Sequence, residues 1–260
     1  MNENETKSAL PAQTIAAQKP FPGILPSIGW IVLYFLLQGL ITAMLILLSA
    51  GRETLAKHSG DSTAIDASAV IQDPMVIMWG LVISGLLQTF LMWLYIRRGD
   101  RAQKLGLTHF GRLSFLRTLA VGGMLVVAAL GFNLLYASYI IPGIGMQDEM
   151  RALLASIPRT PVNIAIGFLG IALIAPLVEE LLFRGMLQNA FANKMPVWAA
   201  ITLSAFLFSL VHMQPYAIPA LMSLGIAFGY LYHRTGSLRT NILLHIANNS
   251  AALLLTQGIG

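Results

Sequence analysis

Long runs of apolar residues dominate this chain, and short polar segments separate them. A transmembrane α-helix needs about 20 such residues, and seven stretches reach or approach that length. They lie at about 27–49, 74–96, 115–140, 161–192, 197–213, 216–233 and 239–257. The fourth is too long for one simple span, and a break in the third or the fourth would give eight. The pattern therefore predicts an all-α fold, a polytopic membrane helical bundle of about seven or eight transmembrane helices.

Composition agrees with a membrane protein. Hydrophobic residues make up 56% of the 260 residues, charged residues only 10%, and the mean hydropathy is +0.71. A soluble domain carries about 25% charged residues. The net charge of +5 does not indicate nucleic-acid binding, because the cations cluster in short loops beside apolar stretches, as the positive-inside rule expects. The chain has no cysteine, which excludes disulfides and thiolate catalysis.

Loop charge predicts the orientation in the membrane. Five cations between the second and third apolar stretches, and Arg117 just inside the third, oppose one aspartate, whereas the loop at 50–73 holds more acidic than basic residues. The basic loop is therefore expected in the cytoplasm, which also places the N-terminus there. Residues 1–25 lack a basic region followed by a short apolar core, so we expect a disordered polar tail rather than a cleaved signal peptide. Residues 26–150 are expected to form the N-terminal transmembrane helices.

Two adjacent glutamates, Glu179 and Glu180, are the only acidic residues among the last hundred. A carboxylate at membrane depth costs about 3 kcal/mol or more unless something pairs with it or uses it. On a helix, Glu180 and Arg184 are spaced i, i+4 and can form an ion pair, whereas Glu179 points about 100° away. We therefore expect Arg184 to neutralise Glu180 and Glu179 to face a reaction site. A purely structural ion pair would leave Glu179 unexplained.

The fourth and fifth stretches are expected to form an antiparallel pair around the turn at 193–197. Residues at equal distances from this turn then lie opposite each other, which places Glu179 beside His212, each about 20 Å from the turn. Phe208 lies one helical turn before His212, on the same face. A lone buried histidine is more often a packing residue than a catalyst, but the shared depth with Glu179 favours a functional role.

Polar residues also gather in the last apolar stretch. His245 and Asn249 share a helix face at i, i+4, and Asn248 lies on the other side of His245 and could substitute. Interhelical hydrogen bonding, worth about 0.6 kcal/mol on average in membranes, is the structural alternative. In the sixth stretch, Gly225 and Gly229 form a Gly-x-x-x-Gly pattern, which indicates close helix packing within or between chains.

Several catalytic signatures are absent from the chain. There is no His-Glu-x-x-His zinc-protease helix and no Gly-x-Ser-x-Gly nucleophile elbow. No aspartate lies inside a predicted span, which excludes an intramembrane protease with paired catalytic aspartates.

Three short motifs carry a resemblance to a known family. They read Glu179-Glu180-x-x-x-Arg184, Phe208-x-x-x-His212 and His245-x-x-x-Asn249. Their order, spacing and membrane context are similar to those of the CPBP family of intramembrane proteases, also called the ABI family. This family includes the type II CAAX prenyl endopeptidases and bacteriocin self-immunity proteins. The resemblance covers about residues 160–257 and implies a CAAX-protease-like transmembrane domain there.

The resemblance implies a role for each motif. Glu179, together with His212, would activate a water molecule for attack on a peptide carbonyl. His245 and Asn249 would stabilise the oxyanion that forms, and the neighbouring ion pair would support the site. Donors aimed at a developing oxyanion typically contribute about 3–4 kcal/mol each.

A metal is the alternative reading of the same residues. Glu179, His212 and His245 could form a two-histidine, one-carboxylate zinc set with water in the open position. The glutamate–histidine water mechanism needs no metal, so the sequence makes no cofactor certain and leaves a divalent metal such as zinc open.

The leading functional hypothesis is an integral-membrane endopeptidase that cuts near the cytoplasmic face. Its expected partners are the lipid bilayer and, as substrate, a membrane protein or a lipid-associated peptide. The short loops and the missing secretory signal suit a bacterial inner membrane, where prenylated CAAX proteins are not an expected substrate. The alternative is a non-catalytic membrane scaffold or bacteriocin-immunity protein. A transporter or proton relay is a third hypothesis, which the absence of an internal repeat disfavours.

Overall fold

The computed structural model describes residues 21–58, 73–110, 115–142, 152 and 155–256, and these residues contain helices and no strand. The N-terminal helices are α1 (Ile24–His58), α3 (Pro74–Ile96), the short α4 (Arg101–Lys104) and α5 (Phe115–Leu135), which continues as the π-helical η1 (Tyr136–Ile140). Next come α7 (Pro161–Gly167), the π-helical η2 (Phe168–Ile174), α8 (Ala175–Glu179), the π-helical η3 (Glu180–Gln188) and α9 (Asn189–Ala192). The last elements are α10 (Val197–Leu210), the 3-10 turn η4 (Pro215–Ala217), α11 (Ile218–Thr235) and α12 (Leu238–Thr256). The predicted all-α fold is confirmed.

Within the described residues, five helices are long and apolar enough to cross a membrane. They are Ile24–Arg52, Pro74–Ile96, Leu116–Ile140, Pro161–Ala192 and Pro215–Thr235. The other two predicted spans are helical but fall short of this standard. With 14 residues, α10 is about 21 Å long, less than the roughly 30 Å of a hydrocarbon core. Although α12 has 19 residues, its polar side chains, among them Arg239, Asn241 and His245, lower its hydropathy.

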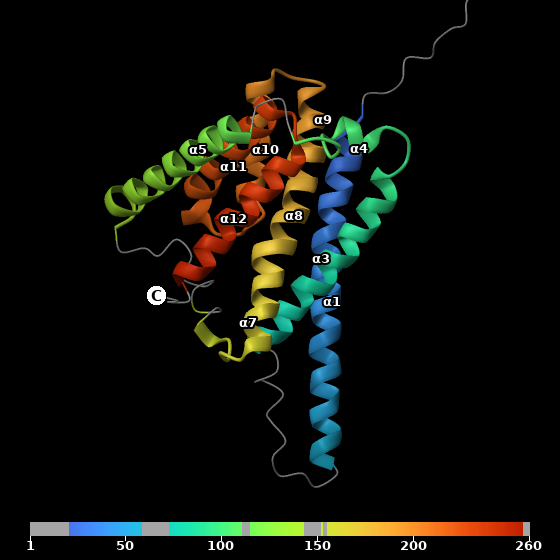
Figure 1. Cartoon of the computed structure of the whole chain (residues 1–260). Helices are drawn as coiled ribbons and strands as arrows, with labels where there is room; N and C mark the ends of the chain where they lie inside the picture. The colour runs from blue at the N-terminus through green and yellow to red at the C-terminus, as the bar shows by residue number, and fades with distance from the viewer. Residues whose placement is uncertain (1–20, 59–72, 111–114, 143–151, 153–154, 257–260) are drawn as a thin grey trace, which may run out of the picture.

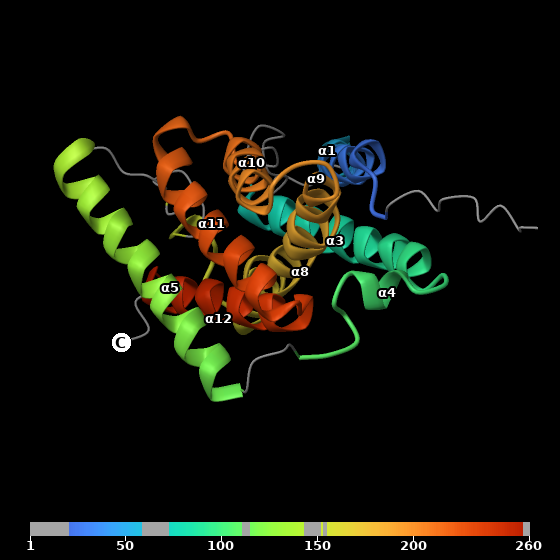
Figure 2. The ribbon, with the colours of Figure 1, turned by 90° about the horizontal axis from the view of Figure 1, so that it is seen from above.

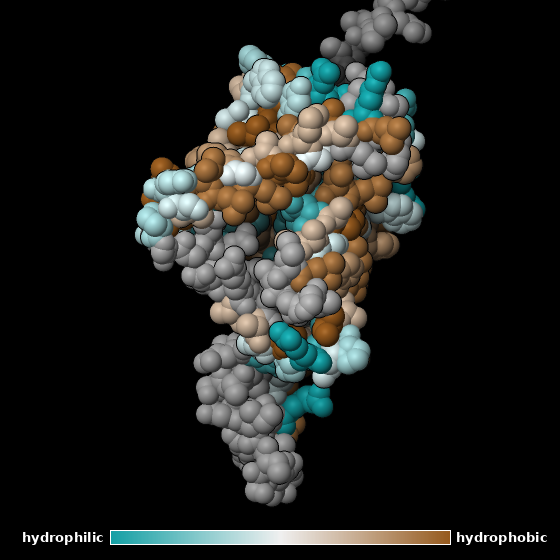
Figure 3. Space-filling model, turned by 60° about the vertical axis from the view of Figure 1, so that its left-hand side comes forward, coloured by the Kyte–Doolittle hydropathy of each residue, from teal (hydrophilic) through white to brown (hydrophobic). Residues whose placement is uncertain are grey.

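The surface of the bundle is apolar where lipid would contact it. Large hydrophobic side chains are exposed along α1 and α5, including Leu36, Leu40, Leu47, Met124 and Val127. Figure 3 shows apolar residues across much of one face, with hydrophilic atoms recessed in a hollow between them. Exposed apolar surface of this extent marks contact with a membrane, so the chain is an integral membrane protein.

One continuous helical rod, residues 161–192, lies at the centre of the bundle. Thr160 begins it, because its hydroxyl accepts the Asn163 N–H at 3.2 Å and Pro161 occupies the first position. In Figures 1 and 2, α1 and α3 lie on one side of this rod, and α10, α11 and α12 lie on the other. The rod therefore holds the two glutamates between both groups of helices.

The helix α10 returns along this rod, as the sequence predicts. The Ser204 hydroxyl donates to the Phe183 carbonyl at 3.0 Å, and the rings of Phe183 and Phe208 meet edge to face at 5.3 Å. The helix ends at Leu210, three residues before the predicted limit. The turn that follows includes Met213 in the left-handed region (φ 57°) and leads to Pro215, so the helix does not continue into the next element.

The two glycines of the Gly-x-x-x-Gly pattern pack within the chain. A Cβ at Gly225 would lie 2.8 Å from the Ala205 Cβ, and one at Gly229 would lie 2.7 Å from Gln188 Oε1. This close approach also makes the glycine carbonyls accessible. Arg184 Nη2 donates to the Gly225 carbonyl at 3.3 Å, and Gln188 Nε2 donates to the Gly229 carbonyl at 3.0 Å. The sequence left packing within or between chains open, and the structure uses this pattern inside one chain.

The loop after α4 is bound to the turn between α11 and α12. Gly106 adopts the left-handed conformation (φ +69°), and the Gly236 carbonyl occupies the place of a Cβ, so only glycine fits there. The Leu238 N–H donates to the Gly106 carbonyl at 3.0 Å, and the Ser237 hydroxyl donates to the His109 carbonyl at 2.7 Å. These bonds join the N-terminal helices to the last two.

Candidate active site

The Glu180 carboxylate is fully buried and has three side-chain partners. Arg184 Nη1 donates to Oε1 at 2.8 Å, His245 Nδ1 to the same oxygen at 2.9 Å, and Asn241 Nδ2 to Oε2 at 3.0 Å. Arg184 lies one turn along the rod, while the other two partners come from α12. The predicted Glu180–Arg184 ion pair is therefore present, and it is withdrawn from solvent, with exposed fractions of 0% and 1%.

The Arg184 guanidinium is buried between a backbone carbonyl and two aromatic rings. It donates to the Gly225 carbonyl, and its Cζ lies 4.6 Å from the centre of the Phe208 ring and 5.6 Å from that of Phe228. Cations are attracted to such ring faces. A buried ion pair needs partners for its remaining donors and acceptors, and beyond Glu180 the Gly225 carbonyl accepts one of these N–H groups.

The His245 imidazole lies between the two glutamates. Its Nδ1 bonds Glu180, its Nε2 is 3.7 Å from Glu179 Oε2, and its ring stacks on Phe228 at 4.7 Å. Because Nδ1–H donates to a carboxylate, the neutral ring keeps its lone pair on Nε2, the atom nearer Glu179. A separation of 3.7 Å is too long for a direct hydrogen bond, and a water bonded to both atoms suits it.

Glu179 is the accessible member of the glutamate pair. Its side chain is 19% exposed, whereas that of Glu180 is 0% exposed. Tyr34 of α1, itself buried, lies close enough to interact electrostatically with Glu179. The division that the sequence predicts, with one glutamate paired and the other open, is therefore present in the structure.

His212 lies in the turn after α10 and not inside a helix, which corrects its predicted position. Its Nδ1 donates to the Phe208 carbonyl at 2.7 Å, and the two rings meet edge to face at 4.8 Å. The Phe208 ring also approaches His245, at 6.5 Å. Among the described residues, no hydrogen bond or ion pair joins His212 to Glu179 or His245.

Asn249 binds the central rod through a carbonyl that the helix leaves free. The Ala175 N–H donates to the Gly170 carbonyl, five residues back as in a π-helix, and Pro176 has no N–H to offer. The Ile171 carbonyl thus lacks both ordinary helical partners, and Asn249 Nδ2 donates to it at 3.1 Å. This contact gives Asn249 a structural role and leaves its second amide N–H for the predicted oxyanion role.

Two residues of this cluster were not among the sequence candidates. Asn241 binds Glu180 and also donates to the Phe228 carbonyl at 2.8 Å. It lies one turn before His245, so an i, i+4 series extended backward from His245 would have found it. Tyr34 gives no such signal, because only the tertiary fold brings α1 to the rod.

The predicted zinc ligands do not form a complete set in this arrangement. Within the residues that the structure describes, no three histidine, aspartate or glutamate side chains have the spacing of a metal site. Glu179 Oε2 and His245 Nε2 face each other at 3.7 Å, but among the described residues no hydrogen bond or ion pair joins His212 to either of them. We therefore derive no step through a metal, and zinc binding stays a prediction.

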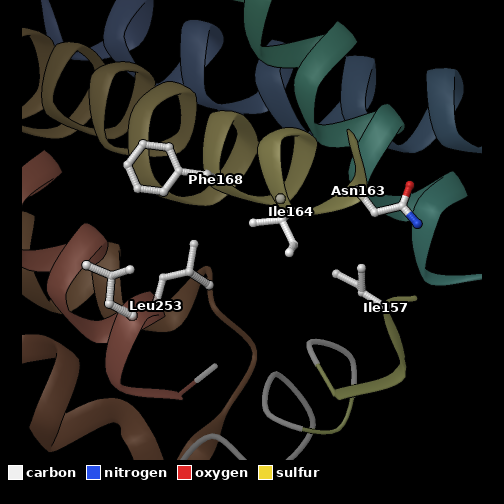
Figure 4. Close-up of a pocket in the computed structure, with 7 residues that line it drawn as sticks. Ile157, Asn163, Ile164, Phe168 and Leu253 are labelled. Atoms are coloured by element: carbon white, nitrogen blue, oxygen red, sulfur yellow. The ribbon is translucent and has the colours of Figure 1, made fainter. Parts of the chain in front are cut away.

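A small apolar cavity of about 40 Å³ lies elsewhere, at the beginning of the rod. Figure 4 shows Ile157, Asn163, Ile164, Phe168 and Leu253 around it. Asn163, its polar member, donates to the Pro158 carbonyl at 3.0 Å. None of the candidate catalytic side chains lines this cavity, so it is separate from the site.

The bundle and its buried glutamate–arginine–histidine cluster define a polytopic membrane protein with a candidate hydrolytic site. Residues 161–251 match the family model described as "Type II CAAX prenyl endopeptidase Rce1-like". This part of the chain is therefore similar to the Rce1-like family, which agrees with the resemblance carried by the three motifs.

A curated relative agrees with this assignment. The chain is 26% identical over 118 residues to a Bacillus subtilis (strain 168) protein named "Putative membrane peptidase YdiL". The match covers 45% of this chain and 47% of the relative, so it spans about half the length of each. No solved structure matches the chain. Together the matches support a membrane, CAAX-protease-like function.

Proposed function

We propose that this protein is an integral-membrane endopeptidase that hydrolyses a peptide bond near the cytoplasmic face, with its N-terminus in the cytoplasm of a bacterial cell. Its substrate would be a membrane protein or a lipid-associated peptide. The family match and the relative's name support a protease. One structural observation supports the mechanism. Glu180 is buried and hydrogen-bonded to three side chains, the adjacent Glu179 is partly exposed, and His245 lies between the two carboxylates.

In the proposed reaction, Glu179 is the general base. It accepts a proton from a water molecule held between its carboxylate and His245 Nε2 while the water oxygen attacks the peptide carbonyl carbon. The C–N bond of the tetrahedral intermediate then breaks, and Glu179 returns the proton to the departing amine nitrogen. The products are a carboxylic acid and an amine. Such positioned proton transfer contributes about 10²–10⁴-fold to a rate.

The other residues hold this arrangement in place. Glu180 fixes the orientation of His245 through Nδ1, and Arg184 balances the charge of Glu180. The donor for the oxyanion is the free amide N–H of Asn249. His212, whose Nδ1 donates to the Phe208 carbonyl, has a lone pair on Nε2 and would hold a water that donates to the oxyanion. A carboxylate–histidine pair that fixes ring orientation is a general device of hydrolytic sites.

The test is cleavage of candidate membrane peptides by the purified protein in detergent. Glu179→Gln should reduce the rate by about 10²–10⁴-fold and leave the folding temperature near that of the unmodified protein, because Glu179 is partly exposed. Unchanged cleavage by this variant would remove Glu179 as the base. Treatment with a chelator should leave cleavage intact; loss restored by zinc would replace the water mechanism with the metal alternative.

The non-catalytic scaffold makes the opposite prediction. The saturated cluster around Glu180 suits a purely structural role, and a scaffold would need only that cluster. A scaffold would keep its partner binding in Glu179→Gln, would cleave none of the candidate peptides, and would lose binding when Gly225 packing is changed.

A further inference from the structure

An open cavity of about 470 Å³ lies at the end of the bundle, between the beginning of α1 and the loop that joins α3 to α4. Its volume falls within the roughly 300–1,000 Å³ of small-molecule sites. Phe21 and Tyr95 supply aromatic walls, and Asp100, Arg101 and Lys104 supply charge. In Figure 1, α4 lies beside the upper end of α1. None of the candidate catalytic side chains lines this cavity.

Arg101 is the main cation of this cavity. Its Nη1 donates to the Tyr95 carbonyl at 3.0 Å, and its Cζ lies 4.3 Å from the centre of the Tyr95 ring and 5.4 Å from that of Phe21. Within the described part of the chain, no carboxylate pairs with it. A guanidinium has five N–H donors, so several remain for a ligand once its position is fixed by these contacts.

The surroundings carry excess positive charge. Lys104 Nζ pairs with Asp100 Oδ2 at 3.0 Å, and both side chains are largely exposed. Arg97 and Arg98 belong to the same loop, so four cations face one aspartate. The site therefore attracts an anion, and the planar guanidinium is suited to a phosphate.

The cavity lies near the end of α3, where apolar helix surface meets a basic loop, and this position suits an amphipathic ligand. Trp93, 52% exposed, lies on the last turn of α3 beneath Arg97, whose Cζ is 4.7 Å from its ring. Exposed aromatic rings under a basic loop mark the level of lipid headgroups. A ligand here can keep apolar chains against α1 and α3 while its anionic group reaches the cations.

We propose that this cavity binds the phosphate group of an anionic membrane lipid, held by Arg101 and Lys104 above the Phe21 and Tyr95 rings. Basic residues near a membrane surface each contribute about fivefold to the affinity for anionic lipids. The lipid would fix the end of α3 to the beginning of α1.

The experiment uses the full chain in an uncharged detergent, with binding followed by native mass spectrometry and by the shift in unfolding temperature. The probes are dioctanoyl phosphatidylglycerol, dioctanoyl phosphatidylcholine and inorganic phosphate. Phosphatidylglycerol should bind more tightly than phosphatidylcholine. Arg101→Gln and Lys104→Gln should each weaken its binding about fivefold, and Asp100→Asn, which releases Lys104, should strengthen it.

The matched control is Arg239→Gln, because Arg239 also lies over an aromatic ring, 5.4 Å from Phe110, but outside the cavity. This variant should bind phosphatidylglycerol like the unmodified protein. Equal weakening by Arg239→Gln would overturn the site in favour of diffuse charge attraction. Equal binding of both lipids, or displacement of the lipid by an equal concentration of inorganic phosphate, would overturn the lipid assignment. The exposed Lys104 and Asp100 keep the test valid if Arg101→Gln does not fold.

Discussion

Two carboxylates that are neighbours in the chain lie in opposite surroundings. Glu180 faces a closed region where Arg184, His245 and Asn241 occupy its oxygens. Glu179 faces an open region, is 19% exposed, and has His245 Nε2 at 3.7 Å. The closed region supplies rigidity, and the open region keeps an acceptor free for chemistry. The contrast shows how one helix turn can provide both a buried, paired carboxylate and an accessible one.

The largest loss of stability is expected from a substitution that removes a partner of Glu180. Arg184→Met should lower the free energy of unfolding by about 3–5 kcal/mol, because it leaves the Glu180 charge buried without its partner. The measurement is equilibrium unfolding in detergent. Glu179→Gln is the matched control and should change stability by less than about 1 kcal/mol. If both variants were equally unstable, the distinction between the two regions would be wrong.

A smaller effect is expected from the helix contact that supports Arg184. Gly225→Ala places a Cβ 2.8 Å from the Ala205 Cβ and 3.1 Å from its Cα, which is backbone. The helices must separate, so the free energy of unfolding should fall by about 1–3 kcal/mol. Gly123→Ala in α5 is the control, since nothing lies within 4 Å of that position. Equal free energies of unfolding for the two variants would show that α10 and α11 can separate to admit the Cβ without loss of stability.

The smallest effect concerns the hydrogen bond between α12 and the rod. Asn249→Ala should lower stability by about 1 kcal/mol, because it removes a membrane hydrogen bond and leaves the Ile171 carbonyl without its partner. Pro176→Ala restores an N–H that can serve this carbonyl. The loss caused by Asn249→Ala should therefore be smaller in the Pro176→Ala background, as a double-mutant cycle measures. Equal losses in both backgrounds would contradict the proposed origin of this bond.

Local patterns predicted most of the architecture. All seven apolar stretches are helical, and the ion pair of Glu180 with Arg184 follows directly from i, i+4 spacing. The antiparallel return of α10 follows from a short turn between two long helices, and the Ser204 bond to Phe183 confirms it. Each of these features depends on residues close in sequence, or on the geometry of a single turn.

Features that depend on tertiary contacts were not predictable from the sequence. The π-helical segments η2 and η3 have no local sequence code, and they change which residues face α12. Asn241 and Tyr34 reach the glutamates only because α12 and α1 pack on the rod. Among the described residues, five helices have the length and composition of a membrane span, whereas α10 is shorter and α12 carries Arg239, Asn241 and His245.

The contact between Gly106 and Leu238 crosses the boundary of the segment that matches the family. The segment that matches the Rce1-like family begins at residue 161. The turn before α12 nevertheless binds the loop after α4, because the Leu238 N–H donates to the Gly106 carbonyl. Just beyond the C-terminal end of the rod, the Asn193 amide donates to the Pro22 carbonyl at 3.2 Å. A fragment cut at the homology boundary would leave both contacts broken. The segment that matches the family is thus smaller than the part of the chain that these contacts hold together, and a truncated version of this protein should keep residues 21–110.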